Sequence, residues 1–164
     1  MEFVHVELKR ETWMKPEMKV QNEEDAIMAV KKLIQNLDRE VVVSIQIATS
    51  GRVINASVCA MGCMNQAVVS PSEVLRTAIL SGAYGILMIH NHPSGRCKPS
   101  SEDLNLAKKM ATASAMMGIQ LVDFIIVGAC GFTHSVRGFE EEWLCPDYEW
   151  LNAGIVTRSN KEHV

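Results

Sequence analysis

The sequence predicts an α/β (α+β) domain in which a mixed β-sheet is flanked by helices. Its 164 residues suit one domain, and 48% of them are hydrophobic, which is ample for a core. β-Branched runs and amphipathic segments follow one another along the chain. Because they do not alternate strictly as βαβ units, the sheet is expected to be mixed or largely antiparallel.

The first part of the chain predicts a strand, a helix and a β-hairpin. Asn22 is a typical N-cap, and the apolar residues after it recur with the helical period. A β-branched run follows, and Ser50-Gly51 then favours a hairpin turn. The expected elements are a strand at 3–8, a helix at 22–37 and strands at 41–47 and 53–61.

The second part predicts two helices and three strands. Ser70-Pro71 is a typical helix start, and Gly82 and Gly118 are typical helix ends. The segment 93–100, which is rich in Pro, Ser and Gly, predicts a loop before the second helix. The expected elements are helices at 71–80 and 101–117 and strands at 85–90, 119–127 and 132–135.

Three segments are expected along the chain. Residues 1–22 form an N-terminal extension that holds the first strand, and residues 23–138 form the domain. Residues 139–164 form a C-terminal tail whose aromatic side chains dock either on the domain or on another subunit, so a homo-oligomer is one open expectation.

Composition argues against several functional classes. The net charge of −3 argues against broad nucleic-acid binding, which usually needs a basic face. No segment approaches the roughly 20 apolar residues of a membrane span. The odd count of 5 cysteines and the absence of a signal peptide favour a reducing, cytoplasmic location. Cys59 and Cys63 have no second pair at similar spacing, so we expect buried thiols there.

The strongest chemical signal is the segment His90–Gly95 together with Pro99–Asp103. Side chains alternate along a strand, so His90 and His92 project to the same side of a strand end. Asp103 is expected in the first turn of the following helix. Two imidazoles and a carboxylate form a three-ligand set that leaves the fourth position of a zinc ion (Zn2+) open. Taken alone, a His-x-His pair is more often two loop histidines.

Two further residues complete the expected site. Glu40 stands at the edge of an apolar strand, where a buried carboxylate would have a raised pKa and suit a general base; the plainer interpretation is a solvated strand end. Ser100 carries a hydroxyl that can donate to a tetrahedral intermediate. Ser100 and Asp103 also have the spacing of a helix capping box, and both roles can coexist. Asn91, Ser94 and Gly95 are candidates for lining the pocket, and Asn91 is also expected to shape the turn.

These residues resemble the signature of the JAMM (MPN+) metalloproteases. That signature is His-x-His-Pro, six further residues and Ser-x-x-Asp, and His90–Asp103 matches it position by position. The wider string is similar to the RadC branch of the family, over roughly residues 23–136. Further matching segments are 39–41, 71–74 and 121–128.

The resemblance implies a JAB/MPN fold, a curved sheet flanked by helices with cytidine deaminase-like architecture. It implies His90, His92 and Asp103 as zinc ligands, Glu40 as the base and Ser100 as the residue that steadies the intermediate. The implied function is a zinc-dependent metallopeptidase or isopeptidase that acts on an unidentified peptide or protein. The alternative is a non-catalytic JAB/MPN scaffold or a DNA-repair-associated RadC-like protein.

Two departures from the RadC pattern stand out. The segment before residue 23 is too short for the helix-hairpin-helix module of RadC proteins, so nucleic-acid binding through this chain alone is not expected. An Asp-His pair of the family is here Asp123-Phe124. Other chemistries fit less well: a zinc deaminase needs Cys-x-x-Cys, which the sequence lacks, and His90-Asn91-His92 is contiguous, unlike the motif of HNH nucleases.

Overall fold

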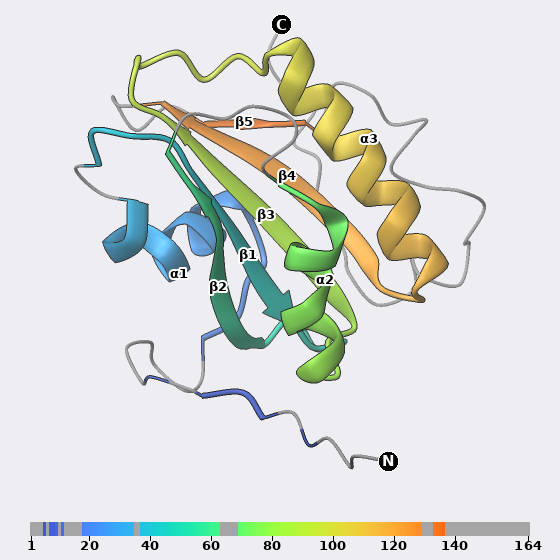
Figure 1. Cartoon of the computed structure of the whole chain (residues 1–164). Coiled ribbons are helices and arrows are strands. Elements are labelled where there is room, and N and C mark those ends of the chain that lie inside the picture. The colour runs from blue at the N-terminus through green and yellow to red at the C-terminus, as the bar shows by residue number, and fades with distance from the viewer. Residues whose placement is uncertain are drawn as a thin grey trace, which may run out of the picture.

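The computed structural model describes residues 5, 7–9, 11, 18–34, 37–62, 69–128 and 133–136. Within them the chain forms three helices and a five-stranded sheet (Figure 1). No described helix is long and apolar enough to cross a membrane. The elements are α1 (Glu23–Ile34), β1 (Val41–Ile47), β2 (Val53–Met61), α2 (Pro71–Leu80), β3 (Gly85–His92), α3 (Ser101–Met116), β4 (Gln120–Gly128) and β5 (Thr133–Ser135).

The sheet is mixed, as the sequence predicts. Its strand order is β2-β1-β3-β4-β5. β1 pairs antiparallel with both β2 and β3, and β4 pairs antiparallel with β5. β3 and β4 are parallel, and the chain between them passes through α3, because parallel neighbours need a crossover connection.

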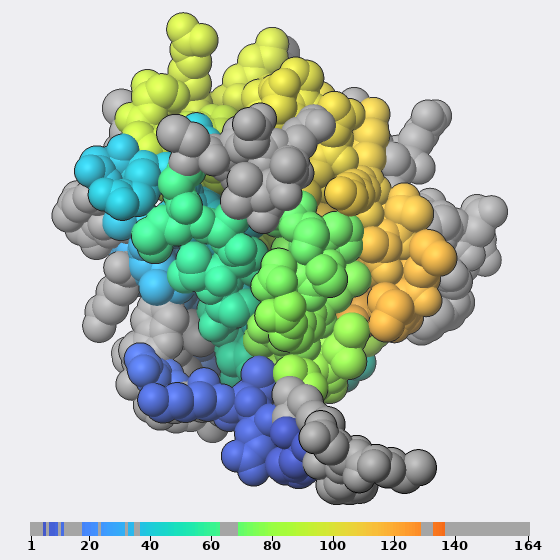
Figure 2. Space-filling model, in the orientation of Figure 1, coloured from blue at the N-terminus to red at the C-terminus, as the bar shows by residue number. Residues whose placement is uncertain are grey.

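Helices cover both faces of the sheet, which explains why the central strands β1, β3 and β4 are buried along almost their whole length. α1 lies on one face, and α2 and α3 lie on the other (Figure 1). Alternate residues of β1 therefore enter two separate cores: Val43 and Ile45 pack with α1, whereas Val42 packs with α2 and α3. Figure 2 shows α2 and α3 side by side over their face of the sheet.

Most predicted boundaries are confirmed, with two differences. Asn22 caps α1, since its Oδ1 accepts the Asp25 N–H at 2.8 Å, and the helix is described as far as Ile34; the next two positions of the expected helix, 35–36, lie outside the described residues. β3 continues two residues further than expected, because His92 still pairs with Gly128 of β4. No strand is present at the described positions of the expected strand 3–8, which are His5 and 7–8. The C-terminal tail lies outside the described residues.

Candidate metal centre

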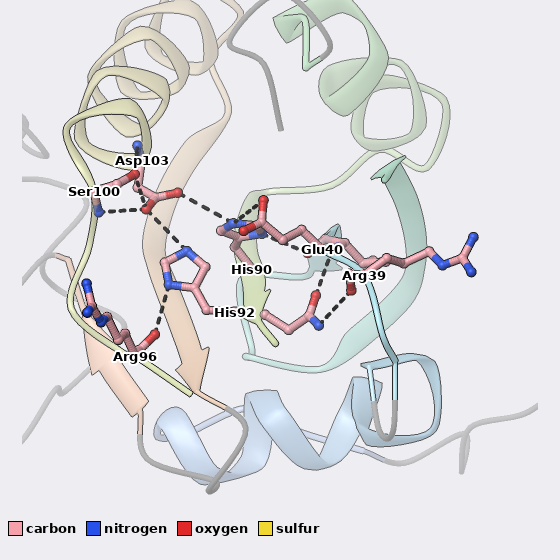
Figure 3. Close-up of polar contacts among 9 residues, drawn as sticks. Arg39, Glu40, His90, His92, Arg96, Ser100 and Asp103 are labelled. Atoms are coloured by element: carbon pink, nitrogen blue, oxygen red, sulfur yellow. Dashed lines mark hydrogen bonds and ion pairs between the residues drawn. The ribbon is translucent and has the colours of Figure 1, made fainter. Parts of the chain in front are cut away.

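The side chains expected to carry chemistry meet at one end of the sheet (Figure 3). His90 and His92 end β3, Glu40 directly precedes β1, and Asp103 lies in the first turn of α3. β1 and β3 are antiparallel neighbours, so the start of one strand lies beside the end of the other. The loop after β3 then brings the N-terminus of α3 to the same place.

Both histidines have one ring nitrogen held by a backbone carbonyl. His90 Nδ1 lies 3.0 Å from the Val41 oxygen, and His92 Nδ1 lies 2.9 Å from the Arg96 oxygen. A carbonyl oxygen can only accept, so each Nδ1 carries the proton and donates it. This leaves the two Nε2 atoms facing the shared space, which is the tautomer that metal-ligating histidines adopt.

Two carboxylates face the same pair of Nε2 atoms. Asp103 Oδ1 lies 3.6 Å from His90 Nε2, and Asp103 Oδ2 lies 3.4 Å from His92 Nε2. Glu40 Oε2 lies 3.9 Å from His90 Nε2. Ligand atoms of Glu40, His90 and His92 all lie within 4.8 Å of one another, so these three residues can hold a metal ion. The three side chains predicted as ligands, His90, His92 and Asp103, also lie next to one another.

Asp103 is a buried and firmly held carboxylate. Its Oδ2 accepts hydrogen bonds from the Ser100 N–H at 2.7 Å and from the Ser100 hydroxyl at 2.6 Å. The Ser100 Oγ in turn accepts the Asp103 N–H, which completes the predicted capping box at the start of α3. Burial would raise the pKa of Asp103, but the hydrogen bonds from His92 and Ser100 outweigh it and lower the pKa to about 2.

The pKa values of the two imidazoles shift in opposite directions. Burial lowers the pKa of His90, against the opposing effects of the Val41 carbonyl and the Asp103 charge, so the ring is neutral at pH 7. The hydrogen bond with Asp103 raises the pKa of His92. A cation that binds between the rings would displace the proton that Asp103 favours on His92, because a ligating imidazole must be neutral.

The backbone around Glu40 is fixed by hydrogen bonds, whereas its side chain is partly exposed. Its side chain is 36% exposed, so the expected burial of this carboxylate is not observed. Asn91 fastens both peptide groups beside it: its Oδ1 accepts the Val41 N–H at 2.7 Å, and its Nδ2 donates to the Arg39 oxygen at 3.1 Å. The Glu40 oxygen also accepts the Gly62 N–H at 2.9 Å. Sequence reasoning missed this role of Asn91; a polar amide inside a buried apolar strand was the available signal.

A surface cleft of about 460 Å³ opens over these side chains. Its volume is within the range of small-ligand sites. Ser94 and Ser100 line it, as expected, together with both histidines and both carboxylates. Asn91 and Gly95, which were candidates for the lining, are not among the residues of its wall.

The comparison with known proteins agrees with this geometry. A family model described as RadC-like JAB domain matches residues 20–142. The chain belongs to this family. Its membership confirms the resemblance drawn from the His90–Asp103 segment, and the mixed sheet with helices on both faces is consistent with the JAB/MPN architecture.

Relatives of this RadC-like JAB domain include several proteins named UPF0758. One from Shouchella clausii is 36% identical over 121 residues, which is 73% of this chain and 53% of the relative. Another from Rubrobacter xylanophilus is 38% identical over 105 residues, 64% of this chain and 46% of the relative. One from Clostridium acetobutylicum is 37% identical over 111 residues, 68% of this chain and 48% of the relative. The chain therefore spans about half the length of these relatives.

The Asp123-Phe124 pair lies next to the site without forming part of it. Phe124 is fully buried, and its ring stacks on His90 with centroids 6.5 Å apart. Asp123 is occupied elsewhere: it accepts the Phe124 N–H at 2.7 Å and the Ser135 hydroxyl at 2.5 Å. Where the family has the histidine of an Asp-His pair, this RadC-like JAB domain therefore has the apolar ring of Phe124, packed against the candidate ligand His90.

Cysteines do not contribute to the metal-binding group that the described residues form. Cys59 is a half-buried free thiol, and burial raises its pKa to about 11, so it carries no thiolate at neutral pH. Cys97 is a half-buried free thiol in the loop before α3 and is not among the residues that line the cleft. Cys63 lies outside the described residues.

Proposed function

We propose that this RadC-like JAB domain is a zinc-dependent hydrolase that cleaves a peptide or isopeptide bond. One observation carries the proposal: two imidazoles, each held at Nδ1 by a backbone carbonyl, turn their Nε2 atoms toward two carboxylates. We propose His90, His92 and Asp103 as the zinc ligands, Glu40 as the general base and Ser100 as a donor to the oxyanion.

The donor set fits zinc. Two nitrogens and one carboxylate oxygen are typical of zinc sites that keep a position free for catalysis. Asp103 suits the third place better than Glu40 because it is buried, ionised and held by Ser100, whereas Glu40 is partly solvated. When bound, zinc would act as a Lewis acid and lower the pKa of a water molecule in the open position.

Glu40 is placed to move protons. Its carboxylate faces the space between the histidines and also reaches solvent, so it can take a proton from the attacking water and deliver it to the leaving amine. The Asn91 side chain keeps the Glu40 backbone in place during this transfer. General acid–base catalysis of this kind contributes roughly 10²–10⁴-fold.

Ser100 has a hydroxyl at the wall of the cleft, where it can donate to the oxygen that gains charge in the transition state. In the structure this hydroxyl donates to Asp103 Oδ2. Its catalytic role therefore requires the hydroxyl to rotate from Asp103 toward the substrate, while the Ser100 N–H continues to hold the carboxylate.

The substrate class completes the proposal. We propose that the cleft takes a peptide or protein in the cytoplasm, without nucleic acid or membrane as a partner. The net charge of −3 and the three carboxylates that line the cleft support a substrate other than a polyanion.

Zinc content and turnover, measured on matched variants, test the proposal. The wild type should bind one zinc per chain and cleave members of a fluorogenic peptide library. His92→Ala and Asp103→Asn should lose zinc, because each removes one of three ligands. Glu40→Gln should keep zinc and lose at least about 100-fold in kcat. Glu102→Gln, which changes an exposed carboxylate on the cleft wall, is the control and should keep both properties.

Three other outcomes would each change one assignment: the general base, the third ligand or the catalytic function itself. Full activity of Glu40→Gln would assign the base to another group. Retention of zinc by Asp103→Asn together with its loss from Glu40→Gln would make Glu40 the third ligand. A wild type that binds zinc and cleaves no peptide would indicate the non-catalytic scaffold instead.

A further inference from the structure

The loop between β3 and α3 places two cations on the wall of the cleft. Arg96 and Lys98 both line it, and both are exposed. Two other arginines of the described chain are engaged: Arg39 pairs with Asp38 at 2.8 Å, and Arg76 pairs with Glu73 at 2.6 Å. Arg96 and Lys98 form no ion pair with any residue that the structure describes, so no described carboxylate pairs with either charge.

The backbone of this loop is tied to the candidate metal centre. The Arg96 oxygen accepts the proton of His92 Nδ1 at 2.9 Å, so the residue that carries one cation also orients a candidate ligand (Figure 3). The Gly95 N–H donates to the His92 oxygen at 3.1 Å, and the Gly95 carbonyl packs closely against Gly128 of β4. These contacts hold the backbone of Arg96 beside His92, and Lys98 follows two residues later in the same loop.

The charges around the cleft favour a small anionic group over a polyanion. Glu40 and Asp103 lie beside the histidines, and Glu102 adds a third carboxylate to the wall. These three acids repel a chain of phosphates. A single carboxylate that reaches Arg96 and Lys98 instead gains charge-assisted hydrogen bonds, which are roughly twice as strong as neutral ones.

We propose that Arg96 and Lys98 select peptides that carry a carboxylate next to the cleaved bond. This inference rests on the proposed hydrolase function and names its substrate class. The carboxylate can come from two sources, the free C-terminus of the peptide or the side chain of an Asp or Glu residue. The first source would make the domain a carboxypeptidase-type enzyme, and the second would make it an endopeptidase with acidic specificity.

Peptide binding tests the inference separately from turnover. Zinc-loaded Glu40→Gln protein is titrated with matched peptides that differ only in Glu against Gln next to the central bond, or in a free against an amidated C-terminus. Calorimetry should show about tenfold or tighter binding for one carboxylate peptide over its neutral partner. Adding Arg96→Gln and Lys98→Gln should abolish this preference, and 0.5 M salt should weaken it.

A second double variant is the matched control. Lys31→Gln with Lys109→Gln removes two exposed lysines of α1 and α3 that do not line the cleft, with the same change in net charge. It should keep the preference for carboxylate peptides. The free C-terminus and the Glu side chain are separate arms, so the arm that shows the preference identifies the source of the carboxylate.

The outcomes that overturn this inference differ from those that overturn the hydrolase. Equal binding of carboxylate and neutral peptides, or a preference that survives Arg96→Gln with Lys98→Gln, would refute it even if the wild type cleaves peptides. Absence of cleavage by the zinc-loaded wild type would refute the hydrolase, and the calorimetric preference would still decide whether the two cations recognise a carboxylate.

Discussion

His90 and His92 can serve a cation only through the ring nitrogen that faces the cleft. The Val41 and Arg96 carbonyls each occupy Nδ1 and so leave Nε2 available. These two acceptors belong to the backbone, which means that a side-chain substitution at either position leaves them in place. The orientation of the ligands is therefore a property of the folded chain path at β1 and at the loop after β3.

Asn91→Ala should lower kcat about 10–100-fold with little change in zinc content. The substitution removes the hydrogen bonds that fix the peptide groups on both sides of Glu40, and small misplacements of a catalytic group cost rates of this order. Steady-state kinetics and elemental analysis measure the two quantities.

The control for this prediction is Asn55→Ala. Asn55 lies on β2, away from the candidate metal centre, and its side-chain amide donates a hydrogen bond to the Ser81 hydroxyl at the end of α2. Both variants should lose stability, and only Asn91→Ala should lose turnover. Equal kcat values for Asn91→Ala and the wild type would show that the function of Glu40 does not depend on the Asn91 hydrogen bonds.

At the scale of an element, the first turn of α3 has two tasks. The capping box satisfies backbone groups that the helix itself leaves without partners. The same hydrogen bonds hold the Asp103 carboxylate beside both histidines and keep it ionised. Helix stability and the candidate ligand thus depend on one serine, Ser100.

Ser100→Ala should therefore reduce stability and zinc affinity together. Loss of an N-cap costs about 1 kcal/mol, and loss of a hydrogen bond to a metal ligand typically costs about 10–100-fold in metal affinity. Urea unfolding and zinc titration measure these effects. Ser101→Ala, which removes an exposed hydroxyl bonded to Glu102, is the control and should change zinc affinity little.

The same element predicts a pH effect on the zinc-free protein. The pKa of Asp103 is about 2 in the folded chain and 3.8 in its ordinary state, so ionisation of this carboxylate stabilises the fold above pH 3.8. This contribution disappears as the pH falls from 3.8 toward 2. The difference in unfolding free energy between the wild type and Ser100→Ala should narrow over that interval, and an unchanged difference would show that Ser100 does not act through the charge of Asp103.

At the scale of the whole molecule, the centre depends on how closely the loop after β3 approaches β4. A Cβ atom at Gly128 would lie 2.6 Å from the Gly95 oxygen, which is too close for any side chain. Gly128 also pairs with His92 across the parallel strands. Two segments more than 30 residues apart in sequence must therefore touch for the loop to reach His92.

Gly128→Ala should lower zinc affinity at least about tenfold and the free energy of unfolding by about 1–3 kcal/mol, because the loop must move away from β4. Zinc titration and urea unfolding measure both. Gly85→Ala provides the comparison. Gly85 lies at the opposite end of β3 from the histidines, and its added Cβ would lie 3.0 Å from Val122 Cγ2. That variant should lose stability only, and equal zinc affinities for the two variants would contradict the proposed dependence on the loop.

The local pattern of residues was sufficient to place most elements and to select most of the candidate site. The helical period of apolar residues located α1, and a β-branched run located β1. The caps at Ser70 and Ser100 marked where α2 and α3 begin, because helix capping depends on near neighbours in the sequence. The spacing of His90 and His92 likewise placed both side chains on one side of β3. Even the family could be read from this one segment.

Other features depended on the pairing of distant segments. The strand register that pairs Val41 with Asn91 brings Glu40 next to the histidines. It also lets the Asn91 side chain, which was expected to shape a turn, bond the backbone on both sides of Glu40. The Arg96 carbonyl meets His92 because the loop packs on Gly128. Strand register and loop packing are set by contacts between residues far apart in sequence, whose energies are summed only when the whole domain is folded, and no local period records them.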